Sequence, residues 1–268
     1  MTDPVTDPVT DNVIEVRGLK NQFGTHVVHE NLDLDLRRGE ILGIVGGSGT
    51  GKSVLLRSIV GLNRPVAGSV KVFGEDITKL SGPAREALER RWGVLFQSGA
   101  LFSSLNVREN VEVPLNAVPG LSPETRSALA ELKVSMAGLP WLANDKSPAD
   151  LSGGMVKRAG LARALALDPE IVFLDEPTAG LDPIGADGFD RLILELRDSL
   201  NLSVFMVTHD LDTLHTCCDR IAVLSQKRVL ATGTIAELLK VDDPWIHEYF
   251  HGPRARAAFS VEEGKEQG

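Results

Sequence analysis

The sequence predicts an α/β fold in which a mainly parallel sheet is joined to a smaller antiparallel β region and interrupted by a helical insertion. Residues 13–37 alternate between polar and apolar side chains with a period of two, which is typical of antiparallel strands with one exposed face. After about residue 170, apolar strand-like runs alternate with helical patterns, as in a parallel sheet covered by helices. Between about residues 84 and 166 the patterns are helical, so we expect this segment to be inserted into the α/β core.

The elements of the first third are strands followed by one helix. VIEVRGL and HVVHENLDLDL fit half-exposed antiparallel strands, and EILGIVG is nearly all apolar, which predicts a buried central strand. The next segment, GKSVLLRSIVGL, predicts a helix that ends at Gly61. GSVKVFGEDI then predicts two more strands around a glycine-containing turn.

The remaining two thirds of the chain are expected to contain the helical insertion, followed by alternating strands and helices. The helices expected in the insertion are PAREALERRWG, SPETRSALAELKVSMAGL and MVKRAGLARALAL. The strands and helices expected after it are, in order, EIVFLDEP, GADGFDRLILELRDSL, LSVFMVTHD, LDTLHTCCD, RIAVLS and RVLATG.

We expect three parts along the chain: a flexible leader at 1–12, one large domain at 13–245 that contains the insertion, and a partly disordered C-terminal extension at 246–268. The leader repeats TDPV and has neither the basic nor the apolar region of a signal peptide. The last residues, VEEGKEQG, are polar throughout, which is typical of disorder.

Composition excludes several classes of protein. The net charge is −9 and the isoelectric point is near 5.2, which argues against a general nucleic-acid binder because phosphate backbones need basic surfaces. No apolar stretch approaches the roughly 18 residues of a membrane span, so we expect any action at a membrane to go through a partner. The only cysteines, Cys217 and Cys218, are adjacent and cannot form an ordinary structural disulfide, which fits a reducing compartment.

The segment GGSGTGKS matches the phosphate-binding pattern G-x-x-x-x-G-K-[ST] and lies between a predicted buried strand and a helix. Glycines let successive backbone N–H groups wrap a phosphate, and the start of the following helix adds a partial positive charge. Lys52 is expected to reach the β- and γ-phosphates, and Ser53 to bind Mg²⁺. The expected nucleotide-binding residues are Gly46, Gly47, Ser48, Gly49, Thr50, Gly51, Lys52 and Ser53.

The segment IVFLDEP is an apolar strand that ends in two carboxylates. Because alternate side chains of a strand point to opposite faces, Asp175 and Glu176 can serve different purposes. We expect Asp175 to hold Mg²⁺ and Glu176 to act as the general base that polarises the attacking water. Taken alone, the motif would be read as a solvated strand end before a proline turn; the phosphate-binding loop changes that interpretation.

The segment LSGGM precedes a predicted helix and offers Ser152, Gly153 and Gly154 as a second set of donors to a phosphate. The alternative is that Ser152 only caps the helix, which is a common role for serine.

Together with GLD and THD farther along, these motifs resemble, in order, the nucleotide-binding domain of ATP-binding cassette (ABC) proteins over about residues 13–239. The resemblance implies a P-loop NTPase core of the RecA-like type with an antiparallel β-subdomain and an inserted α-helical subdomain. It also implies ATP and Mg²⁺ as cofactors, and ATP hydrolysis as the activity.

The same resemblance assigns roles to single residues. Gln97 takes the Q-loop position, where it contacts Mg²⁺ or water near the transmembrane partner. Asp182 matches the D-loop aspartate, and His209 matches the switch histidine near the γ-phosphate, although taken alone that histidine would be read as packed or solvated. Phe23 replaces the usual tyrosine that stacks on adenine, and Met155 replaces the usual glutamine after the LSGG signature.

Family resemblance also predicts partners. In ABC proteins the signature of one subunit closes over ATP held by the other, which implies a head-to-tail homodimer with two ATP sites. The segment from Gln97 to Phe102 corresponds to the groove that receives an integral membrane permease. Leu101 and Phe102 would dock that partner, or alternatively pack into the helical insertion.

The segments LFQSGALF and LSGGM resemble the ATPase subunits of the Mla-type transporters, which maintain lipid asymmetry. This implies a motor for phospholipids or other hydrophobic lipids on the cytoplasmic face of the inner membrane. Another ABC importer class, or less favourably a soluble ABC ATPase, stays as the alternative. The segment DPWIHEYFHG resembles that family's C-terminal extension, so Trp245, Tyr249 and Phe250 either contact the opposing subunit or cover this subunit's own core.

Overall fold

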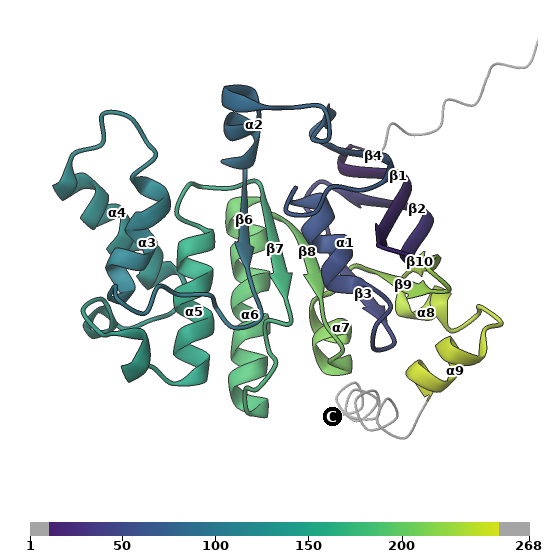
Figure 1. Cartoon of the computed structure of the whole chain (residues 1–268). Coiled ribbons are helices and arrows are strands. Elements are labelled where there is room, and N and C mark those ends of the chain that lie inside the picture. The colour runs from purple at the N-terminus through teal and green to yellow at the C-terminus, as the bar shows by residue number, and fades with distance from the viewer. Residues whose placement is uncertain (1–10, 252–268) are drawn as a thin grey trace, which may run out of the picture.

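The computed structural model describes residues 11–251, and the predicted leader and the last part of the predicted extension lie almost wholly outside that range. A central six-stranded sheet runs between a group of helices on one side and a small antiparallel sheet on the other (Figure 1). Within residues 11–251 no helix is long and apolar enough to cross a membrane.

The smaller sheet has four antiparallel strands in the order β2-β1-β4-β5. Its longest strands pair Ile14 of β1 with Leu36 of β2 and with Val72 of β4, and all three side chains are buried. This is the half-exposed antiparallel region that the alternating sequence predicts. The strands are β1 (Asn12–Phe23), β2 (His26–Arg37), β4 (Ala67–Val72) and β5 (Glu75–Asp76).

The larger sheet has the order β10-β9-β3-β8-β7-β6, and every neighbouring pair is parallel except β10 with β9. Its strands are β3 (Ile41–Gly46), β6 (Trp92–Leu95), β7 (Ile171–Asp175), β8 (Ser203–Val207), β9 (Arg220–Ser225) and β10 (Arg228–Gly233). Because parallel strands end at the same edge, the loops after β3, β7 and β8 meet there.

Helices cover this sheet and form the separate group at its β6 end, where α3, α4 and α5 pack on one another (Figure 1). The helices are α1 (Lys52–Ile59), α2 (Gly82–Glu89), α3 (Val107–Leu115), α4 (Pro123–Met136), α5 (Gly153–Ala164), α6 (Pro183–Leu200), α7 (Leu211–Cys217), α8 (Ile235–Leu238) and α9 (Pro244–His251). Two short 3₁₀ turns, Trp141–Ala143 and Pro148–Asp150, lead into α5.

The predicted insertion at about 84–166 is not helical throughout, because β6 lies inside it and is an edge strand of the large sheet. Trp92 pairs with Ile171, and Leu95 pairs with Leu174. Four residues are too few to show a strand period in the sequence, and the helical pattern before them hides the change. Packing requires the small residue here: a Cβ on Gly93 would lie 1.9 Å from the carbonyl oxygen of Ala164.

The last described helix, α9, covers the core of its own chain. Ile246 and Phe250 are fully buried against a cluster that includes Val45 of β3 and Leu214 of α7. Trp245 stacks on Tyr249 with ring centroids 4.7 Å apart. Of the two alternatives for these aromatic residues, the structure therefore supports packing on the same subunit, and α9 includes the first residues of the predicted C-terminal extension.

Candidate functional site

The loop 46–53 connects the buried strand β3 to the start of α1, as the phosphate-binding pattern predicts. Gly51 is the N-cap of α1 and has a left-handed backbone with φ of 94°. A Cβ at this position would lie 2.4 Å from Nε2 of His29 and from a methyl of Val28. Glycine is therefore required here both by the backbone and by the space beneath it.

Lys52 lies over this loop and is held by it. Its Nζ donates hydrogen bonds to the carbonyl oxygens of Gly46 (2.7 Å) and Gly47 (3.1 Å). Burial lowers the pKa of Lys52, while the carboxylates of Glu176 and Asp175 oppose that shift. The arrangement keeps an ammonium group beside the glycine-rich loop and the N-terminus of α1, which is suited to a polyphosphate.

Ser53 and Asp175 come together although they are far apart in the sequence. The Ser53 hydroxyl donates to Oδ1 of Asp175 at 3.2 Å, and Asp175 is 4% exposed. Burial raises the pKa of Asp175, and the hydrogen bond from Ser53 opposes it. A hydroxyl with one carboxylate fits the hard-oxygen chemistry of Mg²⁺ shared with phosphates and water. The described residues hold no group of three or more His, Cys, Asp or Glu side chains that could enclose a metal by itself.

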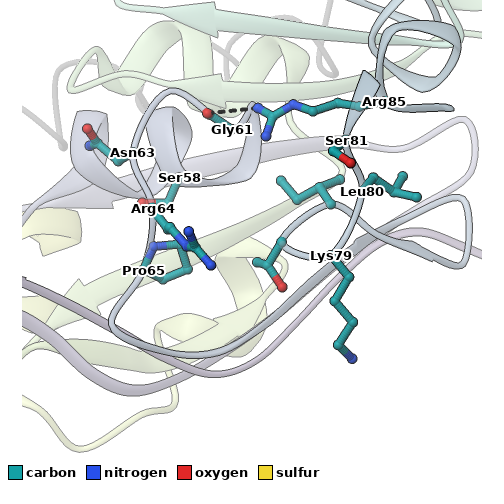
Figure 2. A pocket seen from close by; sticks show the side chains of 11 residues that line it. Ser58, Gly61, Asn63, Arg64, Pro65, Lys79, Leu80, Ser81 and Arg85 are labelled. Carbon is teal, nitrogen blue, oxygen red and sulfur yellow. Dashed lines mark hydrogen bonds between the residues drawn. The ribbon is translucent and has the colours of Figure 1, made fainter. Parts of the chain in front are cut away.

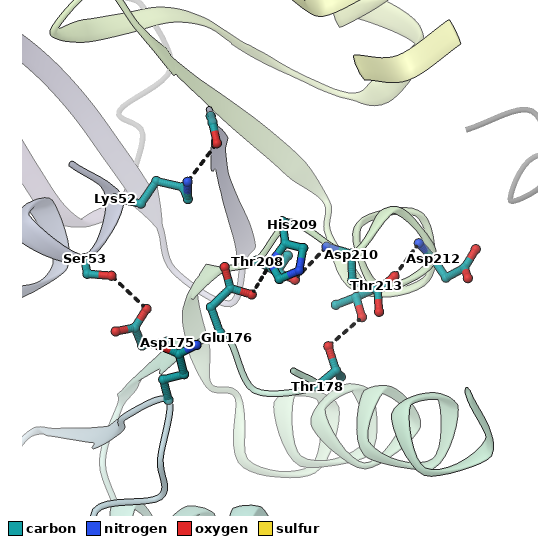
Figure 3. A network of polar contacts seen from close by, with 12 residues as sticks. Lys52, Ser53, Asp175, Glu176, Thr178, Thr208, His209, Asp210, Asp212 and Thr213 are labelled. Atoms are coloured by element: carbon teal, nitrogen blue, oxygen red, sulfur yellow. Dashed lines mark hydrogen bonds and ion pairs between the residues drawn. The ribbon is translucent and has the colours of Figure 1, made fainter. Parts of the chain in front are cut away.

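Glu176 directly follows β7 and points toward His209 (Figure 3). Its Oε2 lies 2.7 Å from Nδ1 of His209, and its side chain is 13% exposed. Its backbone is left-handed, with φ of 51°, which costs a non-glycine residue about 1–2 kcal/mol. The backbone N–H of Glu176 donates to the carbonyl oxygen of Val207 at 2.8 Å, so β8 helps to hold this strained geometry.

The loop that carries His209 is fixed by a polar network behind it (Figure 3). The Thr208 hydroxyl accepts from the N–H of Asp210, and Asp210 caps α7 by accepting from the N–H of Asp212. Thr213 donates to the buried Asp190 at 2.8 Å, and burial raises the pKa of Asp190 to about 6. These bonds limit where the imidazole of His209 can lie.

Three of the expected contributors lie elsewhere in the chain. Ser152 caps α5 by accepting from the N–H of Met155 at 3.3 Å, and Asp182 caps α6 by accepting from the N–H of Gly185 at 3.0 Å. Phe23 ends β1 and is 52% exposed. Among residues 11–251, no hydrogen bond joins the signature residues Ser152, Gly153 and Gly154 to the loop 46–53. One chain thus assembles the loop, Asp175, Glu176 and His209, but not the signature.

A sequence profile of the ABC transporter family matches residues 29–179, more than half of the chain. The chain belongs to the ABC transporter family. It is 38% identical over 243 residues to the probable ribonucleotide transport ATP-binding protein mkl of Mycobacterium leprae, covering 90% of this chain and 69% of that protein. It is 36% identical over 241 residues to the intermembrane phospholipid transport system ATP-binding protein MlaF of Haemophilus influenzae, covering 90% and 91%.

The fold of this chain is similar to that of solved ATP-binding cassettes. A dimeric ATP-binding cassette in a post-hydrolysis state, bound to ADP and Pi, has a TM-score of 0.76 at 29% identity, over 82% of this chain and 98% of that chain. The predicted ABC-ATPase fold is confirmed, and so is the resemblance to MlaF. The chain is an ATP-binding subunit of an ABC transporter, and it hydrolyses ATP.

The Q-loop, residues 97–100, packs against α5, the helix that begins at the LSGG signature. Gln97 is exposed, and its carbonyl oxygen accepts a hydrogen bond from Nζ of Lys157 at 2.5 Å. The guanidinium of Arg163 donates to the carbonyl oxygens of Gly99 (2.9 Å) and Ala100 (2.6 Å). The sequence interpretation missed both cations; Lys157 is buried and Arg163 is half-buried, and both lie on a helix whose other buried positions are mostly apolar.

The two apolar residues expected at the docking groove differ from each other. Leu101 packs partly buried against the helical core, whereas Phe102 is 50% exposed. The buried Asn110 holds the Phe102 backbone from both sides, accepting from its N–H at 2.7 Å and donating to its carbonyl oxygen at 3.1 Å. Phe102 is therefore the more exposed of the two, with the guanidinium of Arg163 5.9 Å from the centre of its ring, and Leu101 is mainly structural.

A buried histidine beneath the phosphate loop was also missed by the sequence interpretation. His29 is fully buried, its Nδ1 lies 3.0 Å from Nδ2 of Asn21, and Oδ1 of Asn21 accepts from Ser58 at 3.1 Å. Burial lowers the pKa of His29 to about 4, so the imidazole is neutral at physiological pH. His29 is a polar residue at an inward-facing position of β2, and this departure from the apolar pattern could have identified it from the sequence.

The cavity in Figure 2 is a separate feature. It measures about 300 Å³ and lies at the C-terminal end of α1, whereas Lys52 begins that helix. Ser58, Arg64 and Arg85 contribute to its lining, and Arg85 donates to the carbonyl oxygen of Gly61 at 2.9 Å. None of the residues predicted for ATP binding lines it.

Proposed function

We propose that this ABC ATPase drives the transfer of phospholipids or other hydrophobic lipids between bacterial membranes. The observation that supports this cargo is the similarity to MlaF, which extends over 91% of that protein rather than over the ATP-binding motifs alone. Transport of a different cargo is the second candidate, because the mkl protein of M. leprae is slightly more similar and is described as a ribonucleotide transporter component.

In the proposed reaction, residues 46–53 hold the phosphates of ATP through backbone N–H groups, and Lys52 turns from the loop carbonyls to the β- and γ-phosphates. Ser53, Asp175 and Gln97 would hold Mg²⁺, which supplies charge neutralisation to the phosphates when bound. Glu176 accepts a proton from the attacking water, and His209 orients the Glu176 carboxylate through their 2.7 Å contact. Phe23 would stack on the adenine.

The working form that we propose is a head-to-tail homodimer with two ATP sites. Ser152, Gly153 and Gly154 lie at the start of α5 and, among residues 11–251, make no hydrogen bond to their own chain's phosphate loop, so a second copy would supply them, with Asp182 nearby. Specific ATPase activity should then rise with protein concentration in the dilute range. A monomer with constant specific activity would contradict the dimer.

We further propose that an integral membrane permease docks on the segment from Gln97 to Phe102, which would place the subunit on the cytoplasmic face of the inner membrane. Support comes from the exposure of Phe102 and from the packing of this segment on α5, directly beside the catalytic loops. No nucleic-acid partner is proposed, given the acidic composition of the chain.

The test is purification from native membranes in mild detergent, identification of the integral protein that accompanies the chain, and reconstitution of the pair into vesicles. We expect ATP-dependent transfer of a labelled phospholipid to acceptor vesicles. Phe102→Asp should lose the integral protein, whereas the control Leu132→Asp, at a 52% exposed position of α4, should retain it. Co-purification of a nucleoside permease without lipid transfer would contradict the lipid assignment.

A further inference from the structure

Lys157 is a buried cation placed between two functional segments. It lies on α5, five residues after the signature serine, and is only 5% exposed. Its Nζ donates to the carbonyl oxygen of Gln97 at 2.5 Å and to the carbonyl oxygen of Glu176 at 2.7 Å. One ammonium group therefore connects the docking segment, the signature helix and the residue expected to activate water.

The bond to Glu176 is made at the point where the backbone is strained. Glu176 has a left-handed conformation that a glutamate rarely adopts, and such a conformation persists only where its surroundings impose it. The Glu176 N–H is held by Val207, and its carbonyl oxygen is held by Lys157. The first bond belongs to the sheet, whereas the second comes from α5, which belongs to the helical group and not to the sheet.

Packing makes the link between α5 and the docking segment rigid. A Cβ on Gly160 of α5 would lie 3.1 Å from the carbonyl oxygen of Gly99, and a Cβ on Gly99 would lie 2.8 Å from a methyl of Val156. Arg163 adds two hydrogen bonds to the carbonyl oxygens of Gly99 and Ala100. Residues 97–100 and α5 therefore have little room to move independently.

We propose that Lys157 is a positioning residue that sets the backbone of Glu176 according to the position of the docking segment. This inference rests on the proposed function, in which Glu176 activates water and residues 97–102 meet the permease. It goes beyond that function because it names one side chain, that of Lys157, as the link between the permease and Glu176. A movement of the permease would change the position of Glu176 through this link. Lys157 touches neither the nucleotide nor the water in this role.

The test compares Lys157→Met, which keeps the length of the side chain but removes its donors, with Lys157→Arg, which keeps donors. Lys133→Met is the matched control, because Lys133 is another buried lysine, 4% exposed, that lies on α4 and pairs with Asp168 away from the catalytic loops. For each full-length chain we would measure kcat and KM for ATP, the Kd of a fluorescent ATP analogue, and Tm.

Lys157→Met should lower kcat by about tenfold to a hundredfold, the scale for a slightly misplaced catalytic group, while the Kd of the analogue changes less than about twofold. Lys157→Arg should recover part of kcat, and Lys133→Met should keep the wild-type kcat. Equal kcat values for Lys157→Met and wild type would overturn the proposal. So would a parallel fall in kcat, analogue binding and Tm, which marks a purely structural role.

Hydrogen exchange supplies a readout of the linkage itself. ATP should change amide exchange over residues 99–105 in the Glu176→Gln background, and adding Lys157→Met should remove that change. An unaltered response would count against the link. If Lys157→Met does not fold, Lys157→Gln, which can reach at most one carbonyl, replaces it with the same expectations. Absence of ATPase activity in the wild type would instead refute the proposed function.

Discussion

The edge of the large sheet and the elements that support it from outside are built on different principles. At the edge, each functional residue belongs to a contiguous motif that follows a buried strand: Lys52 after β3, Glu176 after β7 and His209 after β8. The supports are single residues from distant elements, such as Lys157 of α5 and His29 of β2. The residues proposed for ATP hydrolysis are thus specified by short sequence motifs. Their relative positions depend on contacts between segments that are far apart in the sequence.

The largest effect should come from the edge itself. Glu176→Gln removes the proposed general base but keeps the size of the side chain, so ATP should bind while kcat falls by about a hundredfold or more. Single-turnover hydrolysis and binding of a fluorescent ATP analogue measure the two properties separately. Wild-type turnover in this variant would contradict the proposed role of Glu176. The residues at the sheet edge would then no longer be distinguished from their supports by a catalytic role.

A comparable effect, on stability rather than on catalysis, should come from His29. Its pKa is about 4 in the folded chain, against an ordinary value near 6.5, so only the unfolded chain takes up this proton between those pH values. The contribution of neutral His29 to the free energy of unfolding is therefore complete above about pH 6.5. It is lost as the pH falls to about 4, and the free energy of unfolding then decreases by about 3 kcal/mol.

The measurement is urea unfolding of wild type and of the double variant Asn21→Leu/His29→Phe at pH 7 and at pH 4.5. The double variant replaces both members of the buried pair, and Ser58, which loses Asn21 as an acceptor, keeps the carbonyl oxygen of Val54. Other titrating groups, including Asp190, are common to both proteins and cancel in the difference. The wild type should lose more stability on acidification, and equal losses would show that the histidine is protonated or exposed in the folded chain.

The smallest effect is expected at α9. The Tyr249 hydroxyl donates to the carbonyl oxygen of His209 at 3.2 Å, and Tyr249→Phe removes this bond while keeping the stack on Trp245. Loss of one hydrogen bond corresponds to about 1 kcal/mol, or roughly a fivefold fall in kcat if all of it acts on the position of His209. Steady-state kinetics would detect it, and an unchanged kcat would show that the polar network behind Thr208 is sufficient alone.

Much of this architecture was readable from the sequence because the motifs are contiguous and each follows an apolar strand. The loop 46–53, the pair Asp175–Glu176 and the capping position of Ser152 lie where the patterns predict. The strand β6 was hidden because its four residues show no period and are recognised only by pairing with β7. The two residues expected at the docking groove could not be separated either, since Leu101 and Phe102 are both apolar and differ in burial.

By itself, the sequence determined the α/β class, the glycine-rich loop after β3 and the order of the family's motifs, because strand and helix periodicity and glycine geometry act over a few neighbouring residues. Only the tertiary structure decided that Lys157 bridges Gln97 and Glu176, that His29 lies beneath Gly51, and that α9 packs on its own chain. These contacts join residues distant in sequence, and their formation depends on how whole elements pack.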